Sequence, residues 1–308
     1  MRIVLSGALP NAAQARELIP HIEQHAPALV NWLRAAQAVT TLAEPAQTGT
    51  TAFEYWHLAS LGFKPVDGQN FATGLPLILP HTVSPSEASQ PVWLVELVHV
   101  APARDGAALL PASVLDITAD ESEALLESSA PLFEELGFTV RSAGAQHWRV
   151  TLPEGCLPVN VSPSLVSRTS VNTWWSQAPE SRAWRKLVNT LQMFWFDHPV
   201  NQRRALQQRL PINSAWLFGG CLPGQLPHRT LEKTDILDQL DDPTARQDWA
   251  LWLDTLKTLD FRFSASVREI VFTGEDRIIT VRPHPVERLK KTLGVNKNSW
   301  RHWWSTQH

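Results

Sequence analysis

The stretch Val92–Val100, VWLVELVHV, decides how the fold of this 308-residue chain is interpreted. It is apolar throughout except for Glu96 and His99. A strand with one solvated face would alternate polar and apolar side chains, whereas a nearly continuous apolar run is typical of a strand covered on both faces. The sequence therefore predicts a buried central strand here, with further layers of structure around it.

The residues that follow this strand predict a helix and a hairpin. Thr118 and Glu121 have the spacing of a capping box, in which a hydroxyl and a carboxylate three residues apart satisfy the first amide groups of a helix. The predicted helix covers 119–136 and ends before a glycine. Two antiparallel strands are then predicted over 138–141 and 147–152, around a short Ser-Ala-Gly turn.

The rest of the chain alternates predicted strands and helices. In chain order these are a strand over 2–5, a helical stretch over 12–38 interrupted at Pro20, a loop over 44–51, helices over 53–61 and 181–196, a helix beginning at Pro199, a strand over 213–218, a helix over about 249–256 and a hairpin of 268–272 with 277–281. Strands that alternate with helices, together with two hairpins, predict an α/β fold with mixed α/β layers.

The length of the chain allows one domain or two. Residues 64–91 are rich in Pro, Gly and Ser, which is typical of a long loop or an internal boundary. The prediction is a single unit over 1–308, with an alternative division into 1–90, 91–221 and 222–308.

Composition excludes several classes of function. A net charge of -3 gives no basis for nucleic-acid binding, which relies on a basic surface. No apolar run approaches the ~20 residues that cross a bilayer, and residues 1–10 do not form a signal peptide, so we expect a cytoplasmic protein without a membrane partner. Cys156 and Cys221 form neither a disulfide framework nor a paired metal motif. The 14 Trp residues predict extensive structural packing.

The most informative polar segment carries His198, Asn201 and Arg204, followed by Asn213. His198 lies at a predicted helix start, where amide groups and the helix dipole favour an anion. Asn201 and Arg204 share one face of that helix, and a guanidinium can hold a phosphate or carboxylate through two parallel hydrogen bonds. The alternative is that the two asparagines cap backbone ends while the arginines are solvated or in salt bridges.

Two smaller motifs lie close by. Gly219 and Gly220 follow a predicted strand and would let a ligand approach the backbone, but they lack the other residues of a P-loop or a dinucleotide motif, so a tight turn is the favoured explanation. Cys221 is a candidate nucleophile with His198 or His228 as its base. Nothing local completes a triad, so an inert buried thiol is favoured.

Two groups of aspartates are candidate metal ligands, namely Asp105, Asp116 and Asp120, and then Asp235, Asp238, Asp241 and Asp242. The first group suits turns and caps, and the second suits a solvated loop before a helix. Neither has the spacing that would converge several oxygens on a hard cation.

The C-terminal tail mixes basic and aromatic side chains, namely Lys290, Lys291, Lys297 and Arg301 with Trp300, Trp303 and Trp304. Such a mixture can stack on nucleic acid. The negative net charge instead favours a tail that docks its indoles onto the rest of the protein.

Several motifs together resemble a known family. They are Val98-His99-Val100 with Arg104-Asp105-Gly106, the acidic helix 119–136, His147-Trp148-Arg149-Val150, Leu191-Gln192-Met193, His198-Pro199-Val200-Asn201 with Arg204, Pro211-Ile212-Asn213-Ser214-Ala215-Trp216, and Gly219-Gly220. They keep their order over roughly residues 92–221. On these motifs the chain resembles bacterial proteins of the regulatory protein E type from the Xanthomonas pathogenicity-factor cluster. That group itself looks like a reduced archaeal-type, cofactor-independent phosphoglycerate mutase.

The resemblance implies an alkaline-phosphatase-like remnant with layered helices and a mixed sheet. In the mutases, the core holds two divalent metals through an Asp-Gly element after the first strand, a Ser or Thr nucleophile and later Asp-His ligands. Here Ser6-Gly7-Ala8, without Asp, follows the first strand. The one Asp-His pair, Asp197-His198, lies in the segment that resembles the inserted, substrate-holding part of the mutases. Because two-metal phosphoryl transfer depends on those ligands, the resemblance implies that mutase turnover is lost.

What remains is a non-catalytic, mutase-like pseudoenzyme that binds a small phosphorylated or carboxylate metabolite or acts as a regulatory partner. The resemblance assigns ligand binding to Arg104, His198, Asn201, Arg204 and Asn213, with no catalytic residue, metal or cofactor. One alternative is an active phosphoglycerate mutase or related phosphotransferase, which would hold Mn or Zn. Another is a protein–protein interaction module whose Trp-rich helices form the partner surface.

Overall fold

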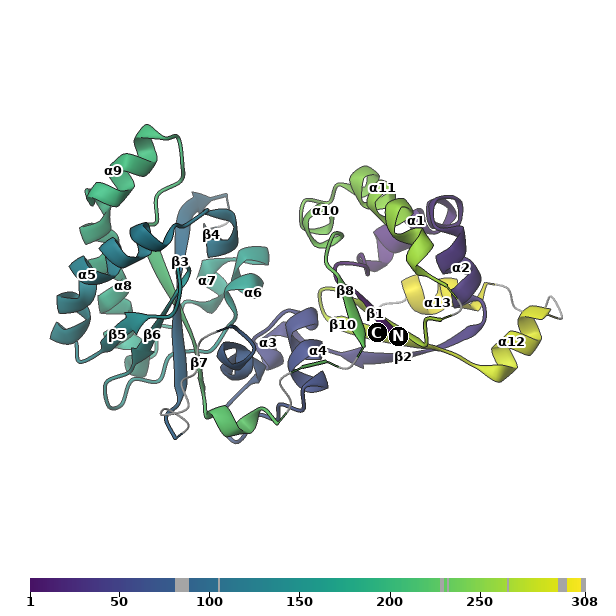
Figure 1. Ribbon diagram of the computed structural model, residues 1–308, viewed down its shortest axis with the longest axis horizontal. Helices are drawn as coiled ribbons and strands as arrows, with labels where there is room; N and C mark the ends of the chain where they lie inside the picture. Colours follow the sequence, from purple (N-terminus) through teal and green to yellow (C-terminus); the bar gives the residue numbers. More distant parts are fainter. Residues whose placement is uncertain are drawn as a thin grey trace. The chain divides into compact units, whose positions relative to one another are not determined.

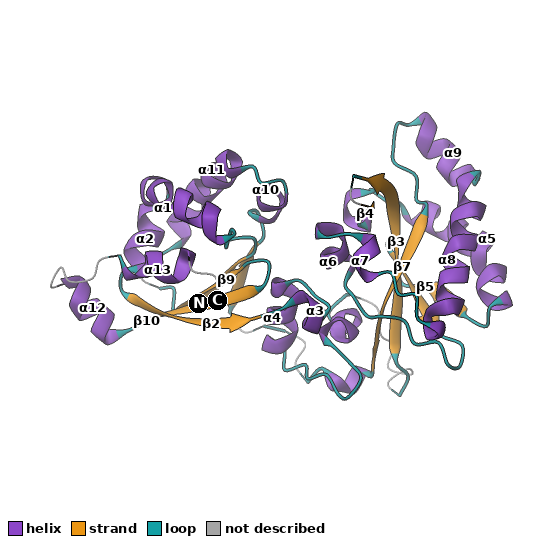
Figure 2. Ribbon diagram, turned by 180° about the vertical axis from the view of Figure 1, so that it is seen from behind, coloured by secondary structure: helices purple, strands orange, loops and turns teal. Residues whose placement is uncertain are grey.

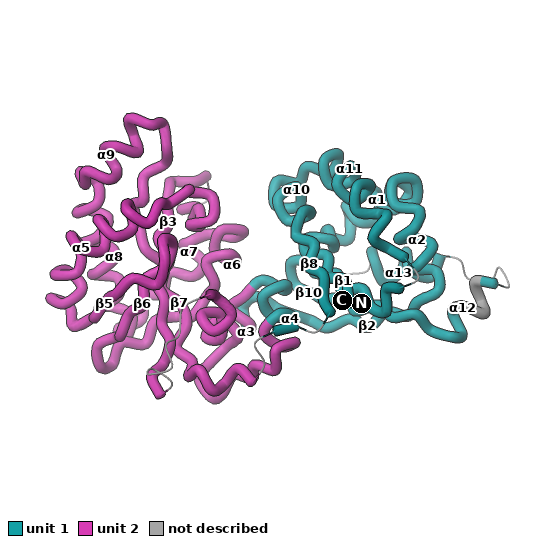
Figure 3. The backbone as a smooth tube through the Cα atoms, in the orientation of Figure 1, with its two compact units in different colours: residues 1–47, 51–57, 230–308 teal, residues 48–50, 58–229 magenta. Residues whose placement is uncertain are grey.

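The computed structural model describes residues 1–80, 89–104, 106–227, 230–231, 233–264, 266–292 and 298–305. The chain forms two compact units (Figure 3), of which unit 1 comprises 1–47, 51–57 and 230–308, and unit 2 comprises 48–50 and 58–229. This division differs from the sequence-based alternative with boundaries near 90 and 221. The reason is that the first strand of the chain pairs with two strands from its C-terminal part, which joins both ends of the chain into one unit.

Unit 1 is built on a five-stranded mixed sheet. In the order β2-β10-β9-β1-β8, its strands are Ala36–Leu42, Arg277–Pro283, Glu269–Thr273, Arg2–Leu5 and Thr234–Leu237. β1 pairs in parallel with β8 and β9, while β10 is antiparallel to both of its neighbours. Ile3, Val4 and Leu5 have no exposed surface, because helices cover both faces of the sheet at β1.

Helices cover both faces of the unit 1 sheet, and one layer contains more helices than the other (Figure 2). One face of the sheet packs against α1 (Ala12–His25), α2 (Pro27–Leu33), α11 (Trp249–Leu259) and α13 (Ser299–Ser305). The other face packs against α4 (Ala52–Ser60). The remaining helical elements are α3 (Pro45–Thr48), α10 (Asp241–Ala245), η6 (Asp260–Arg262) and α12 (Pro285–Thr292).

The C-terminal helix α13 belongs to this core. Trp300 and Trp304 have 0% and 1% of their surface exposed, and Arg301 forms an ion pair with Glu23 of α1 at 2.8 Å. The prediction that the tail docks its indoles onto the protein is confirmed for these two residues. Lys297 and the side chains of Lys290 and Lys291 lie outside the described part of the chain.

Three local predictions in unit 1 are wrong. The helical stretch predicted over 12–38 is divided into α1 and α2 and ends at Leu33, and residues 36–42 form strand β2. Pro20 lies inside α1 without ending it, because the burial of that helix against the sheet offsets the lost hydrogen bond. Residues 234–237, predicted as a solvated loop, form β8. This short strand lacks an apolar pattern and depends on pairing with the buried β1.

Unit 2 is built on an antiparallel sheet around β3. Its strands are β4 (Gly106–Leu110), β3 (Val92–Ala103), β6 (His147–Thr151) and β5 (Thr139–Ser142), with β7 (Ser214–Cys221) on the other side of β3. Val95 and Leu97 pack on one face of β3, and Val98 packs on the other. The predicted buried central strand and the β5–β6 hairpin are therefore confirmed.

Helices flank this second sheet as well (Figure 1). α5 (Ala119–Glu135) and α8 (Arg182–Phe196) cover one face, while α6 (Pro163–Arg168) and α7 (Val171–Trp174) lie over the other. α9 (Pro199–Leu206) follows α8 after a two-residue connection. Short 3-10 turns are η1 (Phe71–Leu77), η3 (Ala112–Val114), η4 (Pro179–Ser181) and η5 (Pro223–Gln225). Two sheets with flanking helices confirm the predicted mixed α/β class.

The 14 Trp residues are structural components of both units. Nine are buried and the other five are half-buried, so no indole is exposed. An interaction module with Trp-rich helices would expose a large aromatic patch. The burial of nine indoles limits such a patch, and with five indoles half-buried the interaction module stays a prediction.

Within the described residues, no helix combines the length and the apolar character needed to cross a bilayer.

Candidate functional site

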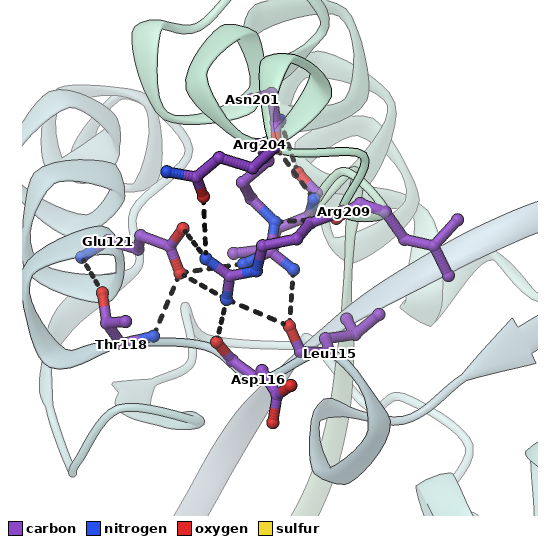
Figure 4. A network of polar contacts seen from close by, with 10 residues as sticks. Leu115, Asp116, Thr118, Glu121, Asn201, Arg204 and Arg209 are labelled. Atoms are coloured by element: carbon purple, nitrogen blue, oxygen red, sulfur yellow. Dashed lines mark hydrogen bonds and ion pairs between the residues drawn. The ribbon is translucent and has the colours of Figure 1, made fainter.

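Arg204, the centre of the predicted ligand site, is fully buried in a network of protein groups (Figure 4). Its Nε donates to the Leu210 carbonyl at 2.7 Å, its Nη1 to the Glu121 carboxylate at 2.8 Å, and its Nη2 to the Leu115 carbonyl. Burial lowers the pKa of Arg204, and the charge of Glu121 acts in the opposite direction. The guanidinium thus has a protein partner at each of its three nitrogens.

Glu121 connects this network to the start of α5. One of its oxygens accepts from the backbone amide of Thr118 at 3.0 Å, and the Thr118 hydroxyl accepts from the amide of Glu121 at 3.2 Å. The predicted capping box is confirmed. The other oxygen accepts from Arg209 at 3.0 Å, and Arg209 also donates to the carbonyl of Asp116. The two arginines and the carboxylate therefore fasten the start of α5 to α9 and to the connection that follows it.

The two predicted asparagines bind backbone groups. Asn201 donates to the carbonyls of Trp195 and Ile212 and accepts from the amide of Ile212, each at 2.8 Å. Asn213 accepts from the amide of Val100 at 2.7 Å and donates to the carbonyl of the same residue at 2.9 Å. Both asparagine side chains thus bind backbone groups, as the alternative to ligand binding predicts.

His198 is the N-cap of α9. Its Nδ1 accepts from the amide of Val200 at 3.2 Å, and its Nε2 lies 3.0 Å from the hydroxyl of Ser128 on α5. Burial, followed by the charge of Arg203, lowers the pKa of His198. A neutral imidazole suits an N-cap acceptor, because protonation of Nδ1 would remove the lone pair that the amide uses.

Arg104 lies apart from these residues. It is exposed in the turn between β3 and β4, and within the described residues it forms no hydrogen bond with the other four predicted ligand residues. The structure therefore brings His198, Asn201 and Arg204 together on α9, places Asn213 at the start of β7 and leaves Arg104 outside the group. The geometry favours a packing role for this segment, while a ligand-binding role stays a prediction.

The Gly219-Gly220 pair approaches β3 rather than a ligand. Both residues have positive φ, and a Cβ at Gly219 would lie 2.4 Å from the carbonyl oxygen of Val92, while one at Gly220 would lie 2.4 Å from the ring of Trp93. The pair belongs to an irregularity in the β3–β7 register, which explains the need for glycine. Cys221 has no exposed surface, and the candidate base His228 lies outside the described residues.

Five of the seven candidate metal ligands have other roles in the structure. Asp116 occupies a turn with φ of 49°, Asp120 lies in the first turn of α5, Asp235 pairs with Arg262, and Asp242 pairs with Arg246 at 2.8 Å. Asp241 accepts a hydrogen bond from the hydroxyl of Ser6, the residue after β1, at 2.9 Å. Asp105 lies outside the described residues, and among those that are described no group of three or more His, Cys, Asp or Glu side chains could hold a metal ion.

Sequence reasoning missed a small pocket in unit 2, with a volume of about 20 Å³, which we call the Trp pocket. Four indoles line it: Trp174 and Trp175 at the end of α7, Trp184 on α8 and Trp216 on β7. Pro158, Val159 and Leu217 complete its apolar wall, and the polar side chains of the lining are those of Ser176, Ser181 and Arg185. The adjacent pairs Trp174-Trp175 and Trp184-Arg185 were signals in the sequence, but the elements that carry them become neighbours only in the fold.

Arg185 is the cationic group of the Trp pocket. Its Nη1 donates to the carbonyls of Ser176 and Ala178, each at 2.8 Å. Its Nε and Nη2 have no hydrogen-bond partner in the described part of the chain, and they are not among the fully buried polar atoms. A guanidinium that is fixed at one nitrogen and accessible at the other two can receive an anion from outside the protein.

Comparisons with known proteins identify no family. No protein-family model matches the chain, and no curated protein matches it significantly. One similar solved structure is a cofactor-independent phosphoglycerate mutase from Thermoplasma acidophilum DSM 1728, with 15% identity, 92% of this chain and 89% of that chain covered, and a TM-score of 0.33. Another is a protein from Pyrococcus horikoshii, with 13% identity, coverage of 94% and 91%, and a TM-score of 0.38.

Similarity at these TM-scores establishes neither a shared activity nor a shared site. One of the two similar structures is named as a phosphoglycerate mutase, the family that the sequence motifs resemble. The comparisons do not support the regulatory protein E part of the resemblance, which stays a prediction.

Proposed function

We propose that this chain binds a small carboxylate or phosphorylated metabolite at Arg185, beside the small Trp pocket, and does not turn it over as a mutase. The accessible guanidinium of Arg185, fixed by two carbonyls and without an acidic partner among the described residues, carries the proposal. The class of ligand is the one that the sequence predicts. We place the binding site at Arg185 rather than at Arg204, because the donors of Arg204 bind protein groups.

The two hydrogen bonds of Nη1 hold the Arg185 side chain in one conformation before an anion binds. A flexible surface arginine loses rotamer entropy when it binds an anion, which offsets much of the gain. Two carbonyl acceptors on Nη1 hold the planar fork of Arg185 in place before any ligand arrives. The remaining Nε and Nη2 donors can then form the parallel pair of hydrogen bonds that carboxylates and phosphates accept.

The walls of the Trp pocket strengthen the interaction. Indoles, Pro158 and Val159 line the pocket beside the guanidinium. A lower local dielectric makes a charge-assisted hydrogen bond stronger than it is in bulk water. An anion therefore gains more at Arg185 than at the exposed Arg104.

Thermal unfolding tests the proposal directly. The melting temperature would be measured with and without millimolar 3-phosphoglycerate and benzoate, first in chelator and then with Mn²⁺. A ligand at 100 times its Kd adds roughly 2.7 kcal/mol, which corresponds to a shift of several degrees. We expect a shift in chelator with at least one of the two anions.

Paired variants locate the site. Arg185→Gln should remove the ligand-induced shift, whereas Arg182→Gln, an exposed arginine one turn earlier on α8, should retain it. An equal shift in both variants would place the anion elsewhere, and the absence of a shift with every anion would refute the proposed function. A shift that appears only with Mn²⁺ would instead support the metal-dependent enzyme.

A further inference from the structure

One edge of the unit 1 sheet is open to a further strand. β2 is the last strand in the order β2-β10-β9-β1-β8, and no strand in the described part of the chain pairs with its outer side. We propose that two copies of the chain associate there, with β2 of one copy antiparallel to β2 of the other and Val39 on the two-fold axis between them. This interface belongs to unit 1 and is independent of the anion site at Arg185.

The backbone of β2 directs hydrogen-bonding groups to this open edge. At the two ends of the strand, the amide of Ala43 donates to the carbonyl of Asp276 at 2.7 Å, and the amide of His284 donates to the carbonyl of Ala35 at 3.0 Å. The register between these points is continuous, and hydrogen-bonded pairs alternate along an antiparallel ladder. Odd-numbered residues of β2 therefore bond to β10, and the even-numbered residues from 36 to 42 direct their amides and carbonyls outward.

Several other outer strands carry features that hinder such pairing. β8 and β5 have four residues each and contain a charged side chain, Asp235 in β8 and Arg141 in β5. On β4, the side chain of Asn172 accepts from the amide of Ala107 at 3.1 Å, and the hydroxyl of Ser170 donates to the carbonyl of Ala107 at 3.3 Å. Shortness, charge and covered backbone groups are common protections of edge strands.

β2 lacks these protections. Its seven residues, AQAVTTL, include no charged residue, no proline and no glycine, and its register is continuous, whereas that of the outer strand β7 is irregular. Gln37, Val39 and Thr41 are exposed, and Val39 has 62% of its surface exposed. An uncharged, regular edge strand of this length is a template for a further strand.

A second copy of β2 is a complementary partner for this edge. With Val39 opposite Val39 of the second copy, residue 36 faces 42 and residue 38 faces 40, so the outward amides and carbonyls meet in hydrogen-bonded pairs. On the exposed face, the two apolar Val39 side chains then meet at the axis, and Gln37 of each copy faces Thr41 of the other. A two-fold contact of this kind uses the same surface on both copies and closes at a dimer.

The charges beside β2 favour the antiparallel arrangement. Arg34 precedes the strand, and Glu44 follows it. Antiparallel pairing brings the Arg34 end of one strand to the Glu44 end of the other, so that opposite charges approach each other. A parallel pair would bring like charges together at both ends. The sequence around the strand thus selects the arrangement that a two-fold axis produces.

The small size of the contact sets the strength that we expect. Seven residues from each copy form a smaller interface than the roughly 1,200–2,000 Å² of a stable complex. The dimer should therefore dissociate on dilution. Its concentration dependence makes it measurable by sedimentation.

Sedimentation velocity of the full chain, from about 1 µM to about 300 µM, tests the proposal. We expect the monomer at the lowest concentration and the dimer at the highest. Val39→Lys places two like charges on the axis and should weaken the dimer about tenfold or more. The control Val66→Lys, at an apolar position of unit 2 with a similar exposure of 58%, should not weaken it.

Mixing two variants separates a specific effect from a loss of folding. Val39→Glu alone should be as monomeric as Val39→Lys, whereas an equal mixture of the two should form a heterodimer, because a carboxylate then faces an ammonium group across the axis. Two variants that dimerise only with each other must both be folded. A mixture that stays monomeric while the parent protein dimerises would overturn the assigned position of the axis.

Oxidative cross-linking tests the register. Residues opposite each other in a non-hydrogen-bonded pair have Cα atoms about 4.5 Å apart, which a disulfide can span. Val39→Cys should therefore form a disulfide between two copies, whereas Thr41→Cys, on the same exposed face, should not, because Thr41 faces Gln37. The natural Cys156 and Cys221 are buried. Cross-linking through Thr41→Cys rather than Val39→Cys would overturn the assigned pairing.

Two further outcomes would contradict the proposal. A chain that remains monomeric at every concentration would overturn it, and the edge of β2 would then be open to a strand of a different protein. A dimer that Val39→Lys leaves unchanged would use another surface, which overturns it as well. Neither outcome affects the anion site, because the thermal shift at Arg185 is measured separately.

Discussion

Two guanidinium groups on successive helices of unit 2 are used in opposite ways. Arg204 on α9 is fully buried and has a protein acceptor at each of its nitrogens, whereas Arg185 on α8 is anchored at one nitrogen and accessible at the other two. The motif in the sequence drew attention to Arg204. The comparison teaches that the number of donors left for a ligand, rather than the motif that contains an arginine, separates a packing group from a binding group.

The largest effect should come from breaking the buried network. Arg204→Ala leaves Glu121 without its buried partner and should lower the free energy of unfolding by about 3–5 kcal/mol. Urea denaturation would measure the loss. Arg203→Ala, at the exposed neighbouring position, should stay within about 0.5 kcal/mol of the parent protein. An Arg204→Ala protein of unchanged stability that no longer binds an anion would reverse the comparison.

Asn201 should show a smaller loss of the same kind. Asn201→Ala leaves the amide and carbonyl of Ile212 and the carbonyl of Trp195 without their side-chain partner, which should cost about 1–3 kcal/mol. Chemical denaturation against Gln202→Ala, an exposed position on the same helix, would measure it. Equal stabilities of the two variants would mean that water replaces the amide, and α9 would then be open to a polar ligand.

The sequence predicts elements where a local pattern suffices. The capping box of Thr118 and Glu121, the apolar run of β3 and the β9–β10 hairpin are all visible as short patterns and are present in the structure. β8 has no such pattern, because a four-residue strand becomes stable only through pairing with β1, more than 200 residues away in the chain. Local reasoning therefore identifies elements whose own sequence carries a clear pattern, and misses strands such as β8, which carry none and form through pairing with a distant strand.

The candidate site likewise combines features that local sequence patterns predict with features that depend on distant parts of the chain. The sequence places Asn201 and Arg204 on one face of a helix, but their partners Ile212, Leu115 and Glu121 come from other elements and decide what the side chains do. Residues of the Trp pocket come from α7, α8 and β7, so no spacing in the sequence announces them. Whether a donor is satisfied is a property of the folded chain, which is why the two arginines could not be told apart beforehand.

Arg185 should affect binding far more than stability. Arg185→Gln removes one donor to two carbonyls, and the free energy of unfolding should fall by no more than about 1 kcal/mol, the net contribution of one hydrogen bond. Loss of the ligand-induced thermal shift in the same protein would sharpen the contrast with Arg204. A loss of several kcal/mol would instead show that Arg185 holds η4 and α8 together as a packing group.

The smallest effect concerns acid stability at His198. Because burial lowers its pKa in the folded protein, the unfolded chain binds more protons as the pH falls below its ordinary value of about 6.5. The stability that His198 contributes is present above that value and is lost as the pH falls through the lower folded pKa. His198→Asn keeps an N-cap acceptor but does not titrate, so its unfolding free energy should fall less between about pH 7 and pH 5.

Burial also lowers the pKa of His57, in unit 1, so the His198→Asn curve should keep that part of the acid dependence. Parallel curves for the variant and the parent protein would contradict the assigned cause.

His198 also tests where an anion binds, because a nearby negative charge favours the charged imidazole and raises its pKa. If phosphate moved the NMR titration midpoint of His198 upward, the anion would bind at the start of α9. An unmoved midpoint, together with an Arg185-dependent thermal shift, would leave α9 to packing and Arg185 to the ligand.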